Sequence, residues 1–266
     1  MELAGKTALL TGATGGLGRA IAAVLAGRGV TLVLSSRKAE ALEELAGSLT
    51  GQGHRCVPAD LAEEGAAQRL VAEAGVLDIL VANAGLPASG RLDAFSHEEI
   101  GRALRVNLEA PIRLARDAIP GMRERGSGHI VFVASLAGKV ASPRTALYSA
   151  TKFGLRGFAL GLREDLWRTG IGASVVLPGF VRDAGMFADA GGRAPMGLGT
   201  ARPSQVGEAV ARAIERDRAE IDVAPLRQRL LINLGHRYPG LASRIQRGGG
   251  ASEVADRIAA GQTDKR

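Results

Sequence analysis

A glycine-rich turn between an apolar strand and an amphipathic helix constrains the fold of this chain most. Residues 7–10 form a short apolar run that ends in Thr11-Gly-Ala-Thr-Gly-Gly-Leu-Gly18, and apolar side chains then recur at helical spacing until Gly27. Glycines in such a turn let the backbone approach a pyrophosphate, whose charge is met by the amides that begin the helix. The turn indicates a dinucleotide site, with a tight strand-to-helix connection as the simpler alternative.

Strand-like and helix-like segments alternate along the rest of the chain. With 266 residues and 46% hydrophobic residues, the chain can bury the core of one α/β domain. We therefore predict a Rossmann-type, doubly wound sheet of about seven parallel strands flanked by helices. The expected strands are residues 7–10, 30–34, 55–58, 78–82, 128–135, 173–177 and 220–223.

The second expected strand ends in Ser36 and Arg37, about twenty residues after the glycine turn. A site that prefers NAD usually places a carboxylate here to accept from the ribose hydroxyls. A guanidinium instead suits a 2′-phosphate, which a carboxylate would repel. The pattern favours NADP(H) over NAD(H), with a solvated helix start as the alternative.

Polar and small residues follow the next two strands. Asp60 could accept from the adenine amino group or serve only as a helix N-cap. Asn83-Ala-Gly85 leaves room for a cofactor that crosses the sheet edge. Ser96-His-Glu-Glu99 predicts a capping box that begins a long helix, in which Asn107 is either functional or simply exposed.

Tyr148 and Lys152 are four residues apart, which places them on one face of a helix. A phenol titrates near pH ~10, and a neighbouring ammonium within about 4–6 Å favours its ionised form. Ser135, thirteen residues upstream, could hold a carbonyl oxygen beside that phenol. Because this spacing is common by accident, the pair alone favours an ordinary helix that carries a surface lysine and a half-buried tyrosine.

Taken together, these motifs resemble the short-chain dehydrogenase/reductase family over roughly residues 4–223, in the family's order and spacing. The resemblance implies that Tyr148 is the general acid or base, that Lys152 lowers its pKa and that Ser135 polarises the substrate oxygen. It also implies that Asn107 holds a water that links Lys152 to solvent. The cofactor-binding residues expected are Thr11, Gly12, Thr14, Gly16, Leu17, Gly18, Ser36, Arg37, Asp60, Leu61, Asn83, Ala84, Gly85, Tyr148, Lys152, Pro178, Gly179 and Val181.

The chain departs from the family pattern in three places. Ala82 stands where a second asparagine is common, and Asp183 stands where a threonine often helps to seat the nicotinamide carboxamide. The glycine-rich ending found in many members is replaced by a longer C-terminal segment. Residues 183–203, rich in glycine and alanine, are expected to form a mobile substrate lid with an apolar inner face.

The C-terminal segment carries most of the net charge. From Leu226 onward there are eight basic and three acidic residues, so +5 of the total +7 belongs to this segment. We expect a catalytic domain at residues 1–225 and a basic amphipathic extension at 226–266 that is partly disordered at its end. Its leucines resemble the branch of the family that acts on lipophilic substrates, and they could lie on an anionic bilayer or pack against the cleft or a partner subunit.

The functional expectation is a reductase or dehydrogenase that interconverts a carbonyl and an alcohol on an apolar small molecule. The alternative is a non-catalytic NADP(H)-binding sensor or scaffold that uses the basic segment. Aromatic residues make up only 3% of the chain, which argues against a nucleic-acid module, and the single cysteine forms neither a disulfide nor a multi-cysteine metal site. We expect a cytoplasmic protein, with possible attachment to a membrane, and a homodimer or homotetramer.

Overall fold

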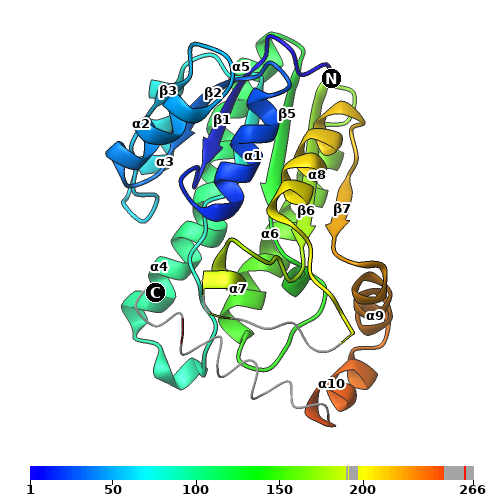
Figure 1. The fold of residues 1–266 in the computed structure, drawn as a ribbon. Coiled ribbons are helices and arrows are strands. Elements are labelled where there is room, and N and C mark those ends of the chain that lie inside the picture. The colour runs from blue at the N-terminus through cyan, green and yellow to red at the C-terminus, as the bar shows by residue number, and fades with distance from the viewer. Residues whose placement is uncertain (190, 192–196, 249–260, 262–266) are drawn as a thin grey trace.

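The computed structural model describes residues 1–189, 191, 197–248 and 261. Its centre is a parallel sheet in the order β3-β2-β1-β4-β5-β6-β7, with helices on both faces (Figure 1). The predicted fold class is therefore confirmed. The strands are β1 (Thr7–Thr11), β2 (Thr31–Ser35), β3 (Arg55–Cys56), β4 (Ile79–Ala82), β5 (Gly128–Val133), β6 (Ile171–Pro178) and β7 (Glu220–Val223).

The helices divide into two layers and a C-terminal pair. Helices α1, α2 and α8 cover one face of the sheet, α3, α5 and α6 cover the other, and α9 and α10 follow β7 (Figure 1). The α-helices are α1 (Gly16–Ala26), α2 (Ala39–Ser48), α3 (Ala66–Ala74), α4 (His97–Leu104), α5 (Ala110–Glu124), α6 (Ala146–Asp165), α7 (Met186–Asp189), α8 (Pro203–Glu215), α9 (Leu226–Arg237) and α10 (Pro239–Gly248). Shorter turns are η1 (Leu92–Ala94), the π-helical η2 (Arg105–Glu109) and η3 (Leu136–Gly138).

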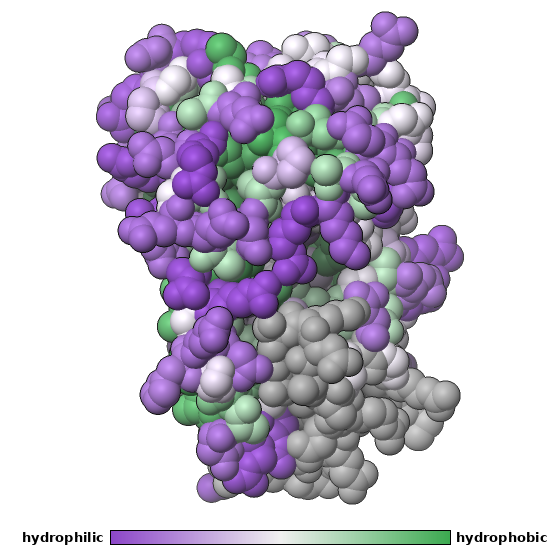
Figure 2. All heavy atoms as spheres, turned by 90° about the vertical axis from the view of Figure 1, so that its left-hand side faces the viewer, coloured by the Kyte–Doolittle hydropathy of each residue, from purple (hydrophilic) through white to green (hydrophobic). Residues whose placement is uncertain are grey.

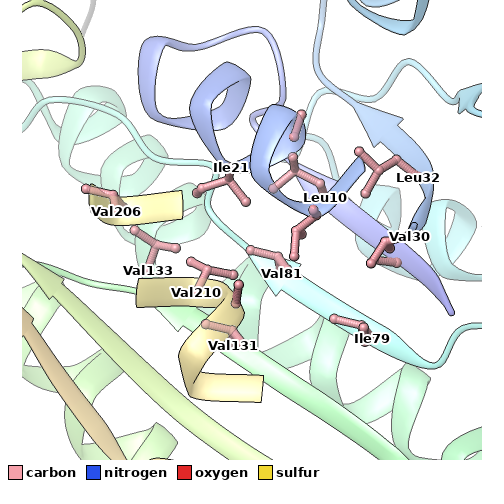
Figure 3. Packing of buried hydrophobic residues seen from close by; sticks show 14 of the residues in the cluster. Leu10, Ile21, Val30, Leu32, Ile79, Val81, Val131, Val133, Val206 and Val210 are labelled. Atoms are coloured by element: carbon pink, nitrogen blue, oxygen red, sulfur yellow. The ribbon is translucent and has the colours of Figure 1, made fainter. Parts of the chain in front are cut away.

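Each buried strand supplies both layers of the core, because successive side chains point to opposite faces. Leu10 lies with Ile21 and Val210 on the α1/α8 side (Figure 3). Leu9 lies on the other side with Phe132, whose ring meets the edge of Phe158 at a centroid distance of 5.5 Å. Polar side chains dominate the face seen in Figure 2, as expected where the apolar ones point inward.

Three element boundaries differ from the sequence prediction in ways that matter for the site. Strand β3 is shorter than residues 55–58, because Pro58 has no N–H to continue the ladder. Strand β5 ends at Val133 and leaves Ser135 just beyond the sheet edge. The long helix that begins at the Ser96 capping box, which is confirmed, contains the π-helical turn η2 between α4 and α5.

Helix α9 packs against the loop that follows β5. Gly235 lies against Val140, and the His236 ring nitrogen is 3.3 Å from the Lys139 carbonyl oxygen. Packing against the cleft side, one of the two placements expected for the basic segment, is therefore present. The described helices include none that is both long and apolar enough to cross a membrane.

Candidate active site

The first turns of α6 bring Tyr148 and Lys152 together behind the end of β5. Lys152 is 3% exposed, and its Nζ donates to the Val133 carbonyl oxygen at 3.2 Å. The same nitrogen lies 5.7 Å from the centroid of the Tyr148 ring. The lysine is thus held by the strand end beneath the phenol, with its charge directed toward the carboxyl edge of the sheet.

Ser135 lies beside Tyr148 because the chain leaves β5 in an extended conformation and then turns sharply into η3. Its Oγ accepts from the Ala137 amide at 3.1 Å and lies 3.4 Å from the Pro178 carbonyl oxygen at the end of β6. Ser135 lies close enough to Tyr148 to lower the pKa of its phenol. The two hydroxyl-bearing side chains therefore lie near each other at the end of β5.

Burial shifts the two ionisable groups in opposite directions, because it disfavours the charged form of each. It raises the pKa of Tyr148, an effect that the hydrogen bond from Ser135 only partly opposes. It lowers the pKa of Lys152 from 10.5 to about 8. In the protein alone, desolvation of the phenol outweighs the other effects on its pKa, and the expected lowering of that pKa by Lys152 stays a prediction.

Asn107 is buried in the π-helical turn η2, so the alternative of an exposed helix residue is wrong. Its Oδ1 accepts from the Leu86 amide at 2.6 Å, and its Nδ2 donates to the Leu86 carbonyl oxygen at 2.9 Å. A Cβ built on Gly85 would lie 3.4 Å from that Oδ1 and 3.8 Å from the Lys152 Nζ. Asn107 and Lys152 thus flank Gly85, and the asparagine fixes the chain that follows β4.

The glycine turn after β1 is packed so tightly that side chains are excluded from it. A Cβ on Gly18 would lie 2.1 Å from the Gly12 carbonyl oxygen, and one on Gly12 would lie 2.8 Å from the Ala84 Cα. Thr11 Oγ1 accepts from the amides of Asn83 and Ala84, both at 3.1 Å. Thr11 therefore joins the ends of β1 and β4 at the carboxyl edge of the sheet.

Comparison with known proteins identifies the family to which this fold belongs. The family model described as short chain dehydrogenase matches residues 6–192. The chain is 37% identical over 256 residues to the ketoacyl reductase HetN of Nostoc sp., covering 92% of this chain and 89% of that protein. This chain belongs to the short-chain dehydrogenase/reductase family.

Two further relatives place the chain within this family. The chain is 34% identical to the 3-oxoacyl-[acyl-carrier-protein] reductase FabG of Rickettsia conorii, covering 68% of this chain and 75% of the relative. A crystal structure of 3-ketoacyl-(acyl-carrier-protein) reductase from Brucella melitensis, complexed with NADH, superposes with a TM-score of 0.76 at 28% identity. That superposition covers 85% of this chain and 99% of the other.

The residues predicted to bind the cofactor of this short-chain dehydrogenase/reductase surround one cleft edge. Arg37 is exposed and forms no ion pair with any described residue, whereas Ser36 Oγ lies 3.4 Å from the Lys38 amide. Asp60 accepts from the Ala62 amide at 2.9 Å and so stabilises a local turn, while Gly65 caps α3. The N-cap alternative for Asp60 is therefore wrong, and adenine contact stays a prediction.

The other predicted cofactor residues lie at the ends of β1, β4 and β6. Pro178 ends β6, Gly179 donates to the Val223 carbonyl oxygen at 3.0 Å, and buried Val181 forms an isolated bridge with Ala201. Leu61 lines a surface cavity of about 330 Å³ between α3 and α5 that contains no candidate catalytic residue. That cavity is therefore separate from the chemistry at Tyr148.

The residues present fit a dinucleotide. The first turn of α1 has no side-chain cap, so its amides are available to an anion, and the glycine cradle leaves no room for a Cβ. Arg37 adds a positive charge at the end of β2 that forms no ion pair with the described residues. Residues Ala184 and Gly185 pack over Gly16, and Met186 reaches Gly85, so the described part of the expected lid lies across this cradle.

Three features of the site were not predicted from the sequence. A Cβ on Gly138 would lie 2.6 Å from the Lys152 carbonyl oxygen, so only glycine lets η3 pack against α6. Lys139 is 7% exposed and is paired with Asp222 on β7. Gln228, from α9, is buried against Gly179. None belongs to a motif, and the apolar–polar pattern around each gave no signal of burial.

Asp183 does not face the cleft. Its φ is +68°, its side chain is 71% exposed, and its carboxylate lies 3.3 Å from the Arg182 guanidinium. The position where the family often has a threonine is therefore turned toward solvent in this chain.

Proposed function

We propose that this protein is an NADP(H)-dependent oxidoreductase that interconverts a carbonyl and a primary or secondary alcohol on an apolar small molecule. One observation carries the proposal: the Nζ of buried Lys152 lies 5.7 Å from the centroid of the Tyr148 ring, and Ser135 lies beside that phenol. This group stands at the carboxyl edge of the sheet, where ligands bind in open α/β folds.

Each side chain has a distinct part in the proposed reaction. Ser135 donates a hydrogen bond to the substrate carbonyl oxygen, and Tyr148 gives that oxygen its proton during reduction or removes it during oxidation. The Lys152 ammonium stabilises the phenolate that forms. The cofactor supplies or accepts the hydride. Asn107 is a positioning residue, because it holds the backbone beside Lys152 and supports a water-linked path to solvent.

Cofactor choice rests on the end of β2. Arg37 is exposed and unpaired among the described residues, so it is available to form bidentate contacts with a 2′-phosphate. Arg37→Asp should therefore weaken NADPH binding by at least tenfold and leave NADH binding nearly unchanged, as measured by fluorescence titration. Lys38→Asp is the matched control for a general charge effect. Equal loss of both cofactors in Arg37→Asp would contradict the NADP(H) assignment.

The substrate class rests on the relatives and on the lid. HetN and FabG are named as reductases of ketoacyl substrates, and the described lid presents Phe187 tilted on Phe180 at 4.8 Å together with Met186. These apolar side chains suit an acyl chain. We therefore propose a 3-ketoacyl thioester as the substrate to be tested first among apolar ketones.

The test is a panel of 3-ketoacyl thioesters, aliphatic ketones and the matching alcohols, assayed with NADPH, NADH and their oxidised forms. We expect NADPH-dependent reduction, fastest with the longer acyl chains. Tight NADPH binding without turnover of any member of the panel would contradict the enzyme proposal and favour a sensor or scaffold.

The proposed setting is the cytoplasm, with a homodimer or homotetramer as the working form. Helix α9 exposes Leu226, Leu230 and Leu234 on the side away from the sheet, and the next acidic residue after Asp222 is Glu253. Exposed leucines among arginines, without acids, suit an anionic lipid surface. We propose peripheral membrane contact through this helix face.

A further inference from the structure

Gln228 is a buried polar side chain that the proposed mechanism does not use. It is 5% exposed, and its Oε1 accepts no hydrogen bond from any residue that the structure describes. Leaving such an acceptor unpaired in a protein interior is unfavourable, because burial removes its hydrogen bonds to water. Because the great majority of buried polar groups have hydrogen-bond partners, the unpaired Gln228 Oε1 requires an explanation.

The chain makes room for this amide at the edge of the active site. A Cβ on Gly179 would lie 2.7 Å from the Gln228 Oε1, 2.8 Å from its Nε2 and 2.9 Å from its Cδ. Any other residue at this position would therefore displace the amide. Gly179 directly follows Pro178, whose carbonyl oxygen lies 3.4 Å from Ser135 Oγ. Gln228 is thus one residue removed from the backbone that contacts a candidate catalytic hydroxyl.

The position of Gln228 is fixed by the helix that carries it. At the other end of α9, Gly235 packs on Val140 and the His236 ring meets the Lys139 carbonyl oxygen, both in the loop after Ser135. The helix therefore spans the ends of both β5 and β6. Its first turn brings the amide to β6, and its last turn holds the loop that follows the catalytic serine.

The topology places this amide on the Ser135 side of the site, away from the glycine turn. The glycine turn and Arg37 follow β1 and β2, whereas α9 follows β7 at the opposite edge of the sheet. Strand β6 and Ser135 lie between these two regions. Ser135 follows β5, which is the direct neighbour of the β6 end that Gln228 contacts, whereas β4 separates β5 from β1 and its glycine turn.

We propose that Gln228 is a specificity-determining residue whose Oε1 accepts a hydrogen bond from an N–H or O–H group of the substrate, a few bonds from the reacting carbonyl. This inference rests on the proposed oxidoreductase function. A 3-ketoacyl thioester on an N-acylated cysteamine arm carries such a donor, because its amide N–H stands two carbons beyond the sulfur. A plain alkyl thioester of equal length lacks it.

The experiment compares acetoacetyl-N-acetylcysteamine with the acetoacetyl alkyl thioester of the same chain length. Calorimetric affinities are measured for the full-length protein saturated with its oxidised cofactor, and kcat/KM is measured with the reduced cofactor. The wild-type protein should favour the amide-bearing compound by about tenfold, as expected for one hydrogen bond to a buried acceptor. Gln228→Met, which keeps the size and removes the polar atoms, should bind both compounds equally.

Stability gives a second and independent readout. Because the orphan acceptor is removed, Gln228→Met should be as stable as the wild-type protein or more stable, whereas loss of an undetected structural hydrogen bond would lower the Tm. Asn233→Met, an exposed position on the same helix, is the matched control and should keep the tenfold preference.

The outcomes separate this inference from the proposed function. Equal affinity of the wild-type protein for the two thioesters, no binding of either, an unchanged preference in Gln228→Met, or a lower Tm of that variant would each overturn the role of Gln228. Tenfold discrimination in binding without turnover would support Gln228 and contradict the proposed reduction.

Discussion

At the residue scale, burial shifts the pKa values of both members of the acid–base pair. Removal from water keeps the Tyr148 phenol protonated at neutral pH and brings the pKa of Lys152 down to about 8. A protonated phenol is the form needed to reduce a carbonyl, and a charged Lys152 is the form that stabilises the resulting phenolate. The two shifts together favour reduction at neutral and mildly acidic pH.

The pH dependence of reduction should report Lys152. Its pKa is lowered from 10.5 to about 8, so the ammonium is present below about pH 8 and is lost above it. We expect kcat/KM for ketone reduction to be level up to about pH 8 and to fall at higher pH. Lys152→Arg, whose guanidinium does not deprotonate, should move this limb upward if it retains activity. A wild-type profile that stays level to pH 10 would contradict the assignment.

The residues that could be predicted from sequence are those whose spacing carries the signal. Tyr148 and Lys152 are four apart on one helix, and Ser135 ends an apolar run, so their meeting follows from local structure. Their pKa shifts were not predictable in direction, because burial arises from packing across the fold. Gln228 was missed because it reaches Gly179 across forty-nine residues of sequence, without a motif to mark the contact.

At the element scale, the loop after β5 is held by buried charges. Lys139 Nζ lies 2.6 Å from Asp222 Oδ1 and 2.7 Å from Glu220 Oε1, both on the edge strand β7. The loop thus carries Ser135 at its start, and four residues later the ion pairs of Lys139 with β7 hold it in place; we call these ion pairs the Lys139 anchor. Because α9 packs on the same loop, this anchor also supports the helix that positions Gln228.

Removing this anchor should destabilise the fold. Lys139→Met leaves the Asp222 carboxylate without its buried partner, while Glu220 keeps its ion pair with Arg156, and we expect the free energy of unfolding to fall by about 3–5 kcal/mol. Arg113→Met is the matched control, since its ion pair with Glu109 is mostly exposed and should contribute only about 0.3–0.5 kcal/mol. Urea denaturation measures both. Equal, small losses would show that the Lys139 cluster is not an anchor.

The order and type of the elements followed from hydrophobic periodicity, but several details did not. The π-helical turn η2 has no periodic signal, because the apolar pattern runs through it from α4 into α5. That turn buries Asn107, which periodicity alone would leave exposed. The sequence also did not predict which face of α9 packs inward, since its leucines suit a lipid surface, the cleft or a partner subunit equally well.

At the scale of the whole molecule, the sheet topology gathers every candidate site residue at one edge. The glycine turn follows β1, Ser135 follows β5, and Gly179 follows β6, so cofactor and substrate regions adjoin without a second domain. Helix α9 closes the substrate side, and its outer face exposes Leu226, Leu230 and Leu234. The same helix therefore packs against the substrate side with one face and exposes leucines to the surroundings with the other.

Membrane contact through that face is open to a direct test. Full-length protein in which Leu226, Leu230 and Leu234 are changed to glutamine should co-sediment less with anionic phosphatidylglycerol vesicles than the wild-type protein, because less apolar area is buried. Glutamines at Val76 and Leu92, exposed apolar positions elsewhere, are the control. Equal sedimentation of all three proteins would exclude α9 as the contact.

The central claim is that the Tyr148 hydroxyl donates the proton to the carbonyl oxygen when this protein reduces a ketone. The most direct measurement is single-turnover NADPH oxidation by wild-type and Tyr148→Phe protein with the best ketone of the panel. Phenylalanine keeps the ring, so the Tm should change little, while the rate at saturating NADPH falls by at least about 10²-fold. A Tyr148→Phe protein that reduces the ketone at the wild-type rate would contradict the account.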